Sequence, residues 1–501
     1  MSHRTRFAAI ATVIALGVAL LPAFPAGAGG GATASQIRLF AATKRVSITR
    51  YPGERIYVDP GIYVEAVGSA FEIKGERSAY QQPIQGTQVL HPDGSAISRP
   101  LPGGTLSQSW QGLAHFMRVT VTDDQGAVVF NSLRPFCPNG WDVQRVDPNS
   151  VPTSRYPQFC GGNPFTKGMV WGIEKGWAVN VFSNAPSFKG PDGTYHVTVQ
   201  IAAKPRALFE VSSADATATV DMTVVTDSSN GCPPFCVSGS PKAPGGARTA
   251  VPIIHNPSAS IQPDLVALPS WGISVDSSSV PGSDYLDFGA TVWNAGPSPM
   301  VVEGFRRRGQ PTMDAWQYFY RGGKAVGRVR AGSLEYDPRP GHEHWHFKQF
   351  AAYRLLDSSK HRVVLSQKEA FCLAPTDAIN LAVPSANWNP GVIGLSTACG
   401  SATSIWTRET LPTGWGDTYF QGLPGQSFDI TNLPNGTYYI QVQANPGGII
   451  RERTRSNDSQ LRRIILGGDP GARTVTVPPW RGIDTEGGGG VGPFADGVLG
   501  G

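Results

Sequence analysis

Hydrophobic and polar residues alternate along many short stretches of this chain. In MRVTVTD (117–123) the apolar positions alternate with arginine and threonine, and the turn residues that follow lead into AVVF (127–130). A period of two places the apolar side chains on one face of a strand, and a turn between two such runs is typical of a hairpin. The pattern recurs in GTYHVTVQIA (193–202), YLDFGATVWNAG (285–296), VVEGF (301–305), FAAYRLLD (350–357) and GTYYIQVQANP (436–446). We therefore expect an all-β protein.

Composition agrees with this fold class. The 501 residues include 60 glycines and 42 prolines, and only 16% are charged. Such a mixture suits turn-rich β structure better than helical bundles, and the length suits two domains. The net charge of +5 is small for this length, so we expect no nucleic-acid partner.

The strand-like stretches fall into two blocks. We expect an N-terminal β-sandwich of unknown role over residues 29–225, a linker rich in Ser, Pro and Gly over 226–260, and a second β-sandwich-type domain over 261–467, in tandem. Residues 468–501 are rich in proline and glycine, and we expect them to form a mobile tail.

One internal echo links the two blocks. PDGTYHVTVQ (191–200) and PNGTYYIQVQ (434–443) share their turn residues and their alternation. Both are either a common solution for entering a strand or a sign of two related sandwiches.

The first residues predict export. Arg4 and Arg6 precede an apolar run over 7–21, and Ala-Gly-Ala at 26–28 offers a cleavage site, so residues 1–28 are typical of a secretory signal peptide. The run is short for a membrane span, and no later stretch reaches about 18 apolar residues. We expect a secreted protein without a membrane span.

Six cysteines fit an oxidising compartment. Sequential pairing is the simplest of the possible connectivities and would give three disulfide bonds. The predicted pairs are Cys137–Cys160, Cys232–Cys236 and Cys372–Cys399.

The most informative stretch is PGHEHWHF (340–347), which places three histidines at every second position. On a strand His342, His344 and His346 would project from one face, roughly 6.6 Å apart at Cα, and their rings would be able to converge on one ion. On a helix they would splay around the axis. Three imidazoles suit copper, zinc or iron and leave coordination positions open. The alternative is a polar strand face that binds nothing.

The second block resembles the lysyl oxidase family of copper amine oxidases. The family's copper motif, His-Gln-His-Tyr-His, has its counterpart in HEHWH (342–346), followed by FAAYRLLD where the family has a Tyr-x-Leu-Leu-Asp strand. QKEAFCLAPTD (367–377) is similar to Lys-Ala-Ser-Phe-Cys-Leu-Glu-Asp, and residues 416–446 are similar to the family's segment from Asp-Thr-Tyr through Asp-Ile-Thr to Asn-Pro. Upstream, PDLVALPSWGI (263–273) resembles its entry strand. The resemblance spans about residues 261–467 and leaves out the N-terminal half.

The resemblance implies a site and a reaction. His342, His344 and His346 would be the copper ligands, and Lys368 and Tyr419 would join into lysyl tyrosylquinone, the family's built-in cofactor. Lys368 must lose its proton to add to the ring, and a desolvated site near a cation lowers a lysine pKa. With molecular oxygen, such an enzyme converts primary amines, including lysine side chains of proteins, to aldehydes, with release of ammonia and hydrogen peroxide.

A general base must remove the α-proton of the amine during this reaction. For this role we name Asp429 in SFDIT, because a buried carboxylate suits proton abstraction. The alternative role for Asp429 is to organise a turn.

The chain departs from the animal enzymes in two places. YDPRPG (336–341) has Arg339 and Gly341 where those enzymes have a His and a Cys, so fewer disulfides should brace the site. Residues 380–406 lengthen the separation of Lys368 from Tyr419, and this insertion would shape the substrate entrance.

Two other functions remain open. A secreted copper-binding or adhesive β-sandwich without turnover would need the histidines but neither Lys368 nor Tyr419. A metal-dependent oxygenase of the double-stranded β-helix type would need a further carboxylate or histidine ligand, and it would leave the lysine and tyrosine segments unexplained.

Overall fold

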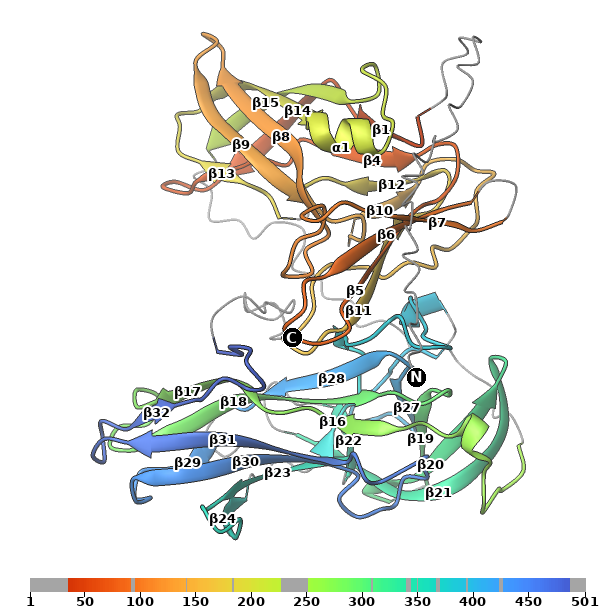
Figure 1. Cartoon of the computed structure of the whole chain (residues 1–501), viewed down its shortest axis with the longest axis vertical. Coiled ribbons are helices and arrows are strands. Elements are labelled where there is room, and N and C mark those ends of the chain that lie inside the picture. The colour runs from red at the N-terminus through yellow and green to blue at the C-terminus, as the bar shows by residue number, and fades with distance from the viewer. Residues whose placement is uncertain are drawn as a thin grey trace, which may run out of the picture. The chain divides into compact units, whose positions relative to one another are not determined.

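Strands make up nearly all the regular structure of the chain in this computed structural model (Figure 1). The structure describes residues 35–91, 95–140, 142–182, 184–226, 251–307, 310–338, 344–348, 350–365, 370–392, 395–422 and 427–486. Within these ranges α1 (Ala203–Leu208) is the only α-helix, so the all-β prediction is confirmed. No helix in the described part of the chain is long and apolar enough to cross a membrane. The predicted signal peptide and the Cys232–Cys236 pair lie outside the described residues.

The first fifteen strands form four sheets. In sheet order these are β1 (Ile37–Ala41), β4 (Ile62–Ala66), β12 (Trp177–Asn180) and β10 (Val143–Arg145); β11 (Gly168–Ile173), β5 (Phe71–Glu76), β6 (Gln85–Leu90) and β7 (Ile97–Pro100); β13 (Ser187–Phe188) and β3 (Ile56–Tyr57); and β2 (Arg45–Arg50), β15 (Thr217–Thr226), β14 (Gly193–Ile201), β8 (Leu113–Asp123) and β9 (Val128–Phe136). β8 and β9 are the predicted hairpin, with Val121 paired to Phe130. The alternating apolar residues of β8 and β14 are buried in the core, as the period-two pattern requires.

The strands from residue 265 onward form three more sheets. In sheet order these are β16 (Leu265–Ala267), β18 (Tyr285–Asn294), β28 (Trp415–Phe420) and β26 (Asp377–Ala378), with β17 (Trp271–Asp276) and β29 (Phe428–Asp429) also on β18; β25 (Ala370–Phe371), β22 (His344–Lys348), β21 (Lys324–Asp337), β20 (Thr312–Arg321), β19 (Met300–Arg306) and β27 (Trp406–Leu411); and β24 (Arg362–Leu365), β23 (Ala351–Leu356), β30 (Gly436–Ala444), β31 (Ser459–Gly467) and β32 (Thr474–Thr476). Two short 3₁₀ turns are η2 (Ala259–Ile261) and η3 (Pro390–Val392). Phe288 of β18 packs edge-on against Tyr353 of β23, with ring centroids 5.8 Å apart, so aromatic side chains fill the space between two of these sheets.

The two sets of strands build separate sheets in the described part of the chain. They are nevertheless joined by backbone hydrogen bonds, from Lys167 N to Ile379 O (2.7 Å) and from Leu381 N to Gly168 O (2.9 Å). Contacts among residues 35–486 place them in one compact unit. The division into two tandem domains with a boundary at 226–260 therefore stays a prediction.

Parts of the predicted linker and of the predicted tail form hydrogen bonds with the sheets. Ile254 at the end of the predicted linker donates its N–H to Arg328 O (2.9 Å). Past residue 467, β32 pairs with β31, and the buried Arg473 guanidinium donates to the carbonyl oxygens of Thr431, Leu433 and Gly468. A guanidinium can satisfy several carbonyls at once in this way. The expectation of a mobile tail over residues 468–501 stays a prediction.

The internal echo is reproduced in detail. The Tyr195 hydroxyl donates to Pro191 O (2.7 Å), and the Tyr438 hydroxyl donates to Pro434 O (2.8 Å). Each tyrosine lies on a strand that follows the same turn, β14 and β30 respectively. This local repeat agrees with either predicted explanation.

Candidate active site

His344 and His346 lie on β22 and point to the same side. Their ring centroids are 4.6 Å apart, and the two Nε2 atoms approach to 2.9 Å. His346 is almost fully buried. The predicted convergence of imidazoles on one face of a strand is therefore present for these two residues, whereas His342 lies outside the described residues.

This pair fits a metal ion by its geometry and its donors. Imidazole nitrogens bind such ions at about 2.0–2.1 Å, and two ligands at right angles around one ion are then separated by the 2.9 Å observed. The same distance suits an N–H···N hydrogen bond between the rings in the absence of an ion. Within the described ranges no group of three or more His, Cys, Asp or Glu residues is arranged to hold a metal. A complete site thus needs a further ligand such as His342.

A carboxylate lies behind the buried imidazole. Asp337 Oδ2 is 3.7 Å from Nδ1 of His346, and β21 pairs Asp337 with His344. A carboxylate on the far side of a metal-binding imidazole orients the ring and raises its basicity. Imidazoles supported in this way suit copper, zinc or iron, so the residues present fit the ion that the resemblance implies.

Trp345, between the two histidines, anchors their strand. Its backbone N–H donates to Cys399 O (3.0 Å) and its indole Nε1 donates to Ser401 O (2.8 Å). The side chain is fully buried, with its ring 5.8 Å from that of Tyr336. Because side chains alternate along a strand, fixing Trp345 on one face also fixes the two imidazoles on the other.

Tyr419 lies on β28 with its ring against Phe371, at a centroid distance of 5.0 Å. The Tyr419 hydroxyl donates to Cys372 O at 2.7 Å. β25 pairs with β22 through Phe371 and Phe347, so the segment that holds Tyr419 is hydrogen-bonded to the histidine strand. Lys368, the predicted partner of Tyr419, lies outside the described residues, four positions before Cys372.

The disulfide bond Cys372–Cys399 connects these two parts of the site. The structure contains this bond and the predicted Cys137–Cys160 bond. The backbone carbonyl of Cys372 accepts a hydrogen bond from the Tyr419 hydroxyl, and the backbone carbonyl of Cys399 accepts one from the Trp345 N–H. The candidate metal ligands and the candidate cofactor tyrosine are therefore tied to the same covalent link.

Buried acids surround the phenol. Burial raises the pKa of Tyr419 well above its ordinary value, and the nearby carboxyls of Asp417 and Glu409 add to this effect. Burial also raises the pKa of Glu409 well above that of an ordinary glutamate. The phenol is therefore protonated at neutral pH, and any chemistry at its oxygen must first remove that proton.

Asp429, the predicted general base, does not lie in the buried setting that was expected for it. It is exposed, and its Oδ1 accepts hydrogen bonds from Thr431 N (3.0 Å) and Thr431 Oγ1 (2.7 Å). β18 pairs Tyr285 with Asp429 and Ala290 with Tyr419, and five residues of strand correspond to about 16 Å. The structure does not bring Asp429 to Tyr419, and its contacts are those of the turn considered as its alternative role.

Glu409 is the residue of this site that sequence reasoning missed. It lies in the stretch WTRETL (406–411), where Thr407 and Leu411 share its face of the strand. A charged residue in the inward row of a strand is a usable signal, but the sequence does not show which row faces inward. Only the packing of β27 against the segment after Cys372 reveals the contact.

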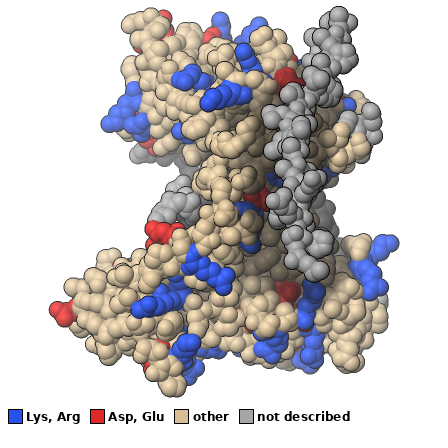
Figure 2. All heavy atoms as spheres, in the orientation of Figure 1, with Lys and Arg blue, Asp and Glu red and all other residues tan. Residues whose placement is uncertain are grey.

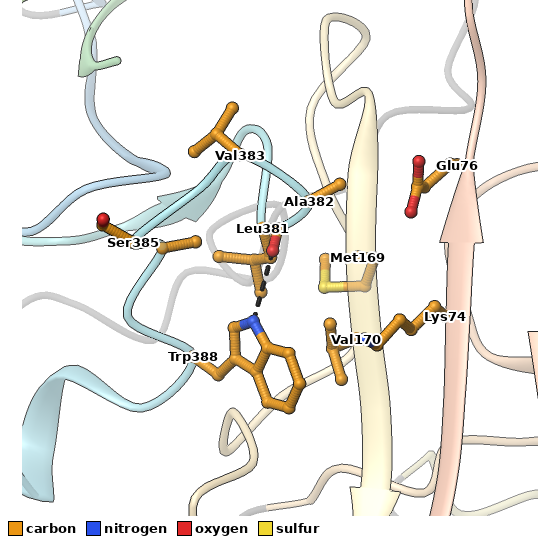
Figure 3. A pocket seen from close by; sticks show the side chains of 10 residues that line it. Lys74, Glu76, Met169, Val170, Leu381, Ala382, Val383, Ser385 and Trp388 are labelled. Atoms are coloured by element: carbon orange, nitrogen blue, oxygen red, sulfur yellow. Dashed lines mark hydrogen bonds between the residues drawn. The ribbon is translucent and has the colours of Figure 1, made fainter. Parts of the chain in front are cut away.

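The insertion at 380–406 lines a cavity that contains none of the predicted site residues. The cavity has a volume of about 230 Å³ and lies between residues 381–388 and the strands β5 and β11 (Figure 3). The Trp388 indole donates to Leu381 O (3.2 Å), and Lys74 Nζ lies 5.1 Å from the centroid of the Trp388 ring. The predicted role of the insertion at a substrate entrance remains untested.

On the face seen in Figure 2, Lys and Arg side chains are spread among other residues. Two arginines of the second block, Arg307 and Arg330, both pair with Asp314. Both arginines belong to local surface ion pairs, which contribute little to stability.

The fold and the site define an all-β protein with converging histidines linked through a disulfide to a buried tyrosine. Comparison with known proteins finds a similar family for part of the second block. Residues 321–472 match the family model described as lysyl oxidase. This match, over less than half of the chain, confirms the predicted resemblance to the lysyl oxidase family.

Individual relatives match over similar lengths. Protein-lysine 6-oxidase of Gallus gallus is 32% identical over 119 residues, which are 23% of this chain and 24% of that protein. Protein-lysine 6-oxidase of Sus scrofa is 31% identical over 119 residues, 23% of this chain and 41% of that protein. Lysyl oxidase homolog 4 of Mus musculus is 28% identical over 140 residues, 28% of this chain and 16% of that protein. The chain thus spans about a quarter of the length of the first of these relatives.

Proposed function

We propose that this chain is a secreted copper-dependent amine oxidase that acts on primary amines, including lysine side chains of proteins. The reaction consumes the amine, molecular oxygen and water and yields an aldehyde, ammonia and hydrogen peroxide. The observation that carries the proposal is a pair of hydrogen bonds to the Cys372–Cys399 disulfide bond. Trp345 of the histidine strand donates its N–H to the Cys399 carbonyl, and Tyr419 donates its hydroxyl to the Cys372 carbonyl. The lysyl oxidase match over residues 321–472 supports it.

The residues would divide the work as follows. His344 and His346, with His342, would hold copper, which supplies oxygen-dependent oxidation when it is bound. Lys368 and Tyr419 would form the lysyl tyrosylquinone, which supplies an electrophilic carbonyl to the amine. The Tyr419 hydroxyl is held at Cys372 O, and the surrounding burial keeps its proton in place until the reaction begins. Asp429 remains the predicted base, although its contacts favour a turn.

Mass spectrometry of copper-grown protein tests the proposal. We expect a peptide digest to contain a fragment that joins the Lys368 and Tyr419 peptides, because a covalent cofactor survives proteolysis. Two separate unmodified peptides would instead favour the non-catalytic copper-binding or adhesive protein, which needs neither residue.

A second measurement tests whether the proposed copper ligands are needed to form the quinone. His344→Ala should abolish peroxide release and quinone colour, because one of the three proposed copper ligands is lost. His196→Ala is the matched control, since that imidazole bonds to Asp221 on β15 at 2.7 Å and lies in the other set of sheets. Quinone colour in newly made His344→Ala protein would contradict copper-driven formation at this site.

A further inference from the structure

The peptide bond between Cys372 and Leu373 is hydrogen-bonded on both of its sides. Its carbonyl oxygen accepts the Tyr419 hydroxyl (2.7 Å), and its N–H donates to Glu409 Oε2 (3.1 Å). The carbonyl and the N–H of one peptide unit lie in a single rigid plane. Glu409 and Tyr419 therefore hold the same plane from opposite edges.

Glu409 is an unusual residue to find in this position. It is fully buried, and within the part of the chain that the structure describes its Oε1 has no hydrogen-bond partner. A buried polar group that lacks a partner destabilises the fold, and an apolar residue of similar volume would fill the same space without this cost. Stability alone thus does not account for an acid here.

The neighbours of Glu409 connect it to both parts of the site. Burial raises its pKa, the carboxyl of Asp417 raises it further, and the backbone N–H groups of Leu373 and Phe347 lower it. Phe347 follows His346 on β22, and Leu373 follows Cys372. Glu409 accordingly contacts the backbone next to the histidine pair and next to the disulfide bond.

We infer that Glu409 is a positioning residue for Tyr419, acting through the Cys372–Leu373 peptide. By holding the Leu373 N–H it fixes the direction of the Cys372 carbonyl, and the carbonyl in turn fixes the far end of the tyrosine side chain. A carbonyl whose own amide N–H is bonded is also a stronger acceptor, because hydrogen bonds in a chain polarise one another. The importance of Tyr419 rests on the proposed function, whereas the hydrogen-bond arrangement does not.

Two substitutions separate the effect of the hydrogen-bond acceptor of Glu409 from the effect of its side-chain volume. Glu409→Gln keeps an oxygen that accepts the Leu373 N–H, and Glu409→Leu fills the space without an acceptor. Glu303→Gln is the matched control, because Glu303 is a buried acid of the neighbouring strand β19 that bonds Arg408 and Trp406 on the other face of β27.

The first readout needs neither copper nor turnover. Metal-free protein labelled with 3-fluorotyrosine gives a ¹⁹F signal for Tyr419, assigned by its absence in Tyr419→Phe. We expect Glu409→Leu to shift and broaden this signal, Glu409→Gln to restore it, and Glu303→Gln to leave it unchanged. An unchanged signal in folded Glu409→Leu protein overturns the inference.

A reciprocal measurement decides the inference if Glu409→Leu does not fold. Tyr419→Phe removes the bond on the other edge of the plane, so exchange of the Leu373 amide proton should accelerate about ten-fold, as expected for one lost hydrogen bond. The Tyr438→Phe variant, which removes a tyrosine–carbonyl bond elsewhere, should leave Leu373 exchange unchanged. Equal exchange in Tyr419→Phe and wild type would show that the two edges are not coupled.

The second readout adds copper. Yield of the joined Lys368–Tyr419 fragment should fall about ten-fold in Glu409→Leu and recover in Glu409→Gln, again as expected for one hydrogen bond. Absence of the fragment from wild-type protein would refute the proposed function, while the fluorine signal would still decide the role of Glu409.

Discussion

Trp345 donates its backbone N–H to the carbonyl oxygen of Cys399 at 3.0 Å. The residues on either side of Trp345, His344 and His346, are candidate metal ligands. Cys399 is bonded through sulfur to Cys372, whose carbonyl oxygen accepts the Tyr419 hydroxyl. The histidine strand is thereby hydrogen-bonded to one of the two cysteines of this disulfide bond.

Removal of Cys372–Cys399 should impair the site as well as the fold. Cys372→Ser with Cys399→Ser opens a loop with a sequence separation of 27 residues, and the Cys137–Cys160 pair closes one of 23. Loops of these lengths predict a similar loss of about 3.5 kcal/mol of unfolding free energy for each pair. We expect copper affinity, measured by titration of folded protein, to fall in the first double variant and to stay at the wild-type level in the second. Equal affinities in both would show that the disulfide does not position the histidines.

Tyr419→Phe should separate metal binding from cofactor formation. The variant loses one hydrogen bond to a backbone carbonyl, so the free energy of unfolding should decrease by about 1 kcal/mol, and quinone colour and peroxide release should disappear. Tyr438→Phe removes a bond of the same kind to Pro434 O and should lose similar stability while retaining turnover. Denaturant melts and a peroxide assay on the same preparations check both parts. Peroxide release by Tyr419→Phe would contradict the assignment.

Asp429→Asn distinguishes the two roles of that residue. Asparagine keeps the side-chain oxygen that accepts from Thr431, so we expect a folded protein whose kcat changes by less than about ten-fold. Loss of a general base would instead reduce kcat by about 10²–10⁴-fold. Steady-state kinetics with a primary amine decide the matter, and a loss of the larger size would restore Asp429 as the base.

Stability should decrease as the pH rises from about 4.5 to about 7. Burial raises the pKa of Glu452 to about 7 and that of Asp287 to about 6. A carboxyl whose pKa is higher in the folded state binds its proton more tightly there, so its contribution is complete below the unfolded pKa and is lost as the pH rises through the folded value. Melting temperatures across this range should fall more steeply in wild type than in Glu452→Gln. A melting temperature that rises through the window would contradict the raised pKa values.

The sequence was sufficient for the strands and for the histidine pair, because both depend on local periodicity. The period of two placed His344 and His346 on one face, and spacing alone paired Cys137 with Cys160 and Cys372 with Cys399. Such patterns carry their information within a few residues or in the order of cysteines.

The remaining features depend on contacts between distant segments. The Tyr419–Cys372–Leu373–Glu409 arrangement joins β28, the segment after β25, and β27, and no local pattern specifies how these pack. The contacts of Arg473 are hidden for a related reason, since composition reports turn content but not the carbonyls that its guanidinium reaches. The expectation of a buried carboxylate suggested Asp429 as a base, whereas strand register determines its distance from Tyr419.

The position of Cys399 after the histidine strand has a consequence for biosynthesis. A chain that emerges N-terminus first exposes His344 and His346 before Cys399, so the carbonyl that holds Trp345 does not yet exist when the imidazoles leave the ribosome. If copper binds as proposed, its capture is a late step of maturation that follows thiol oxidation. Supplying the metal to reduced, newly made protein should therefore give slower loading than supplying it after the thiols have been oxidised.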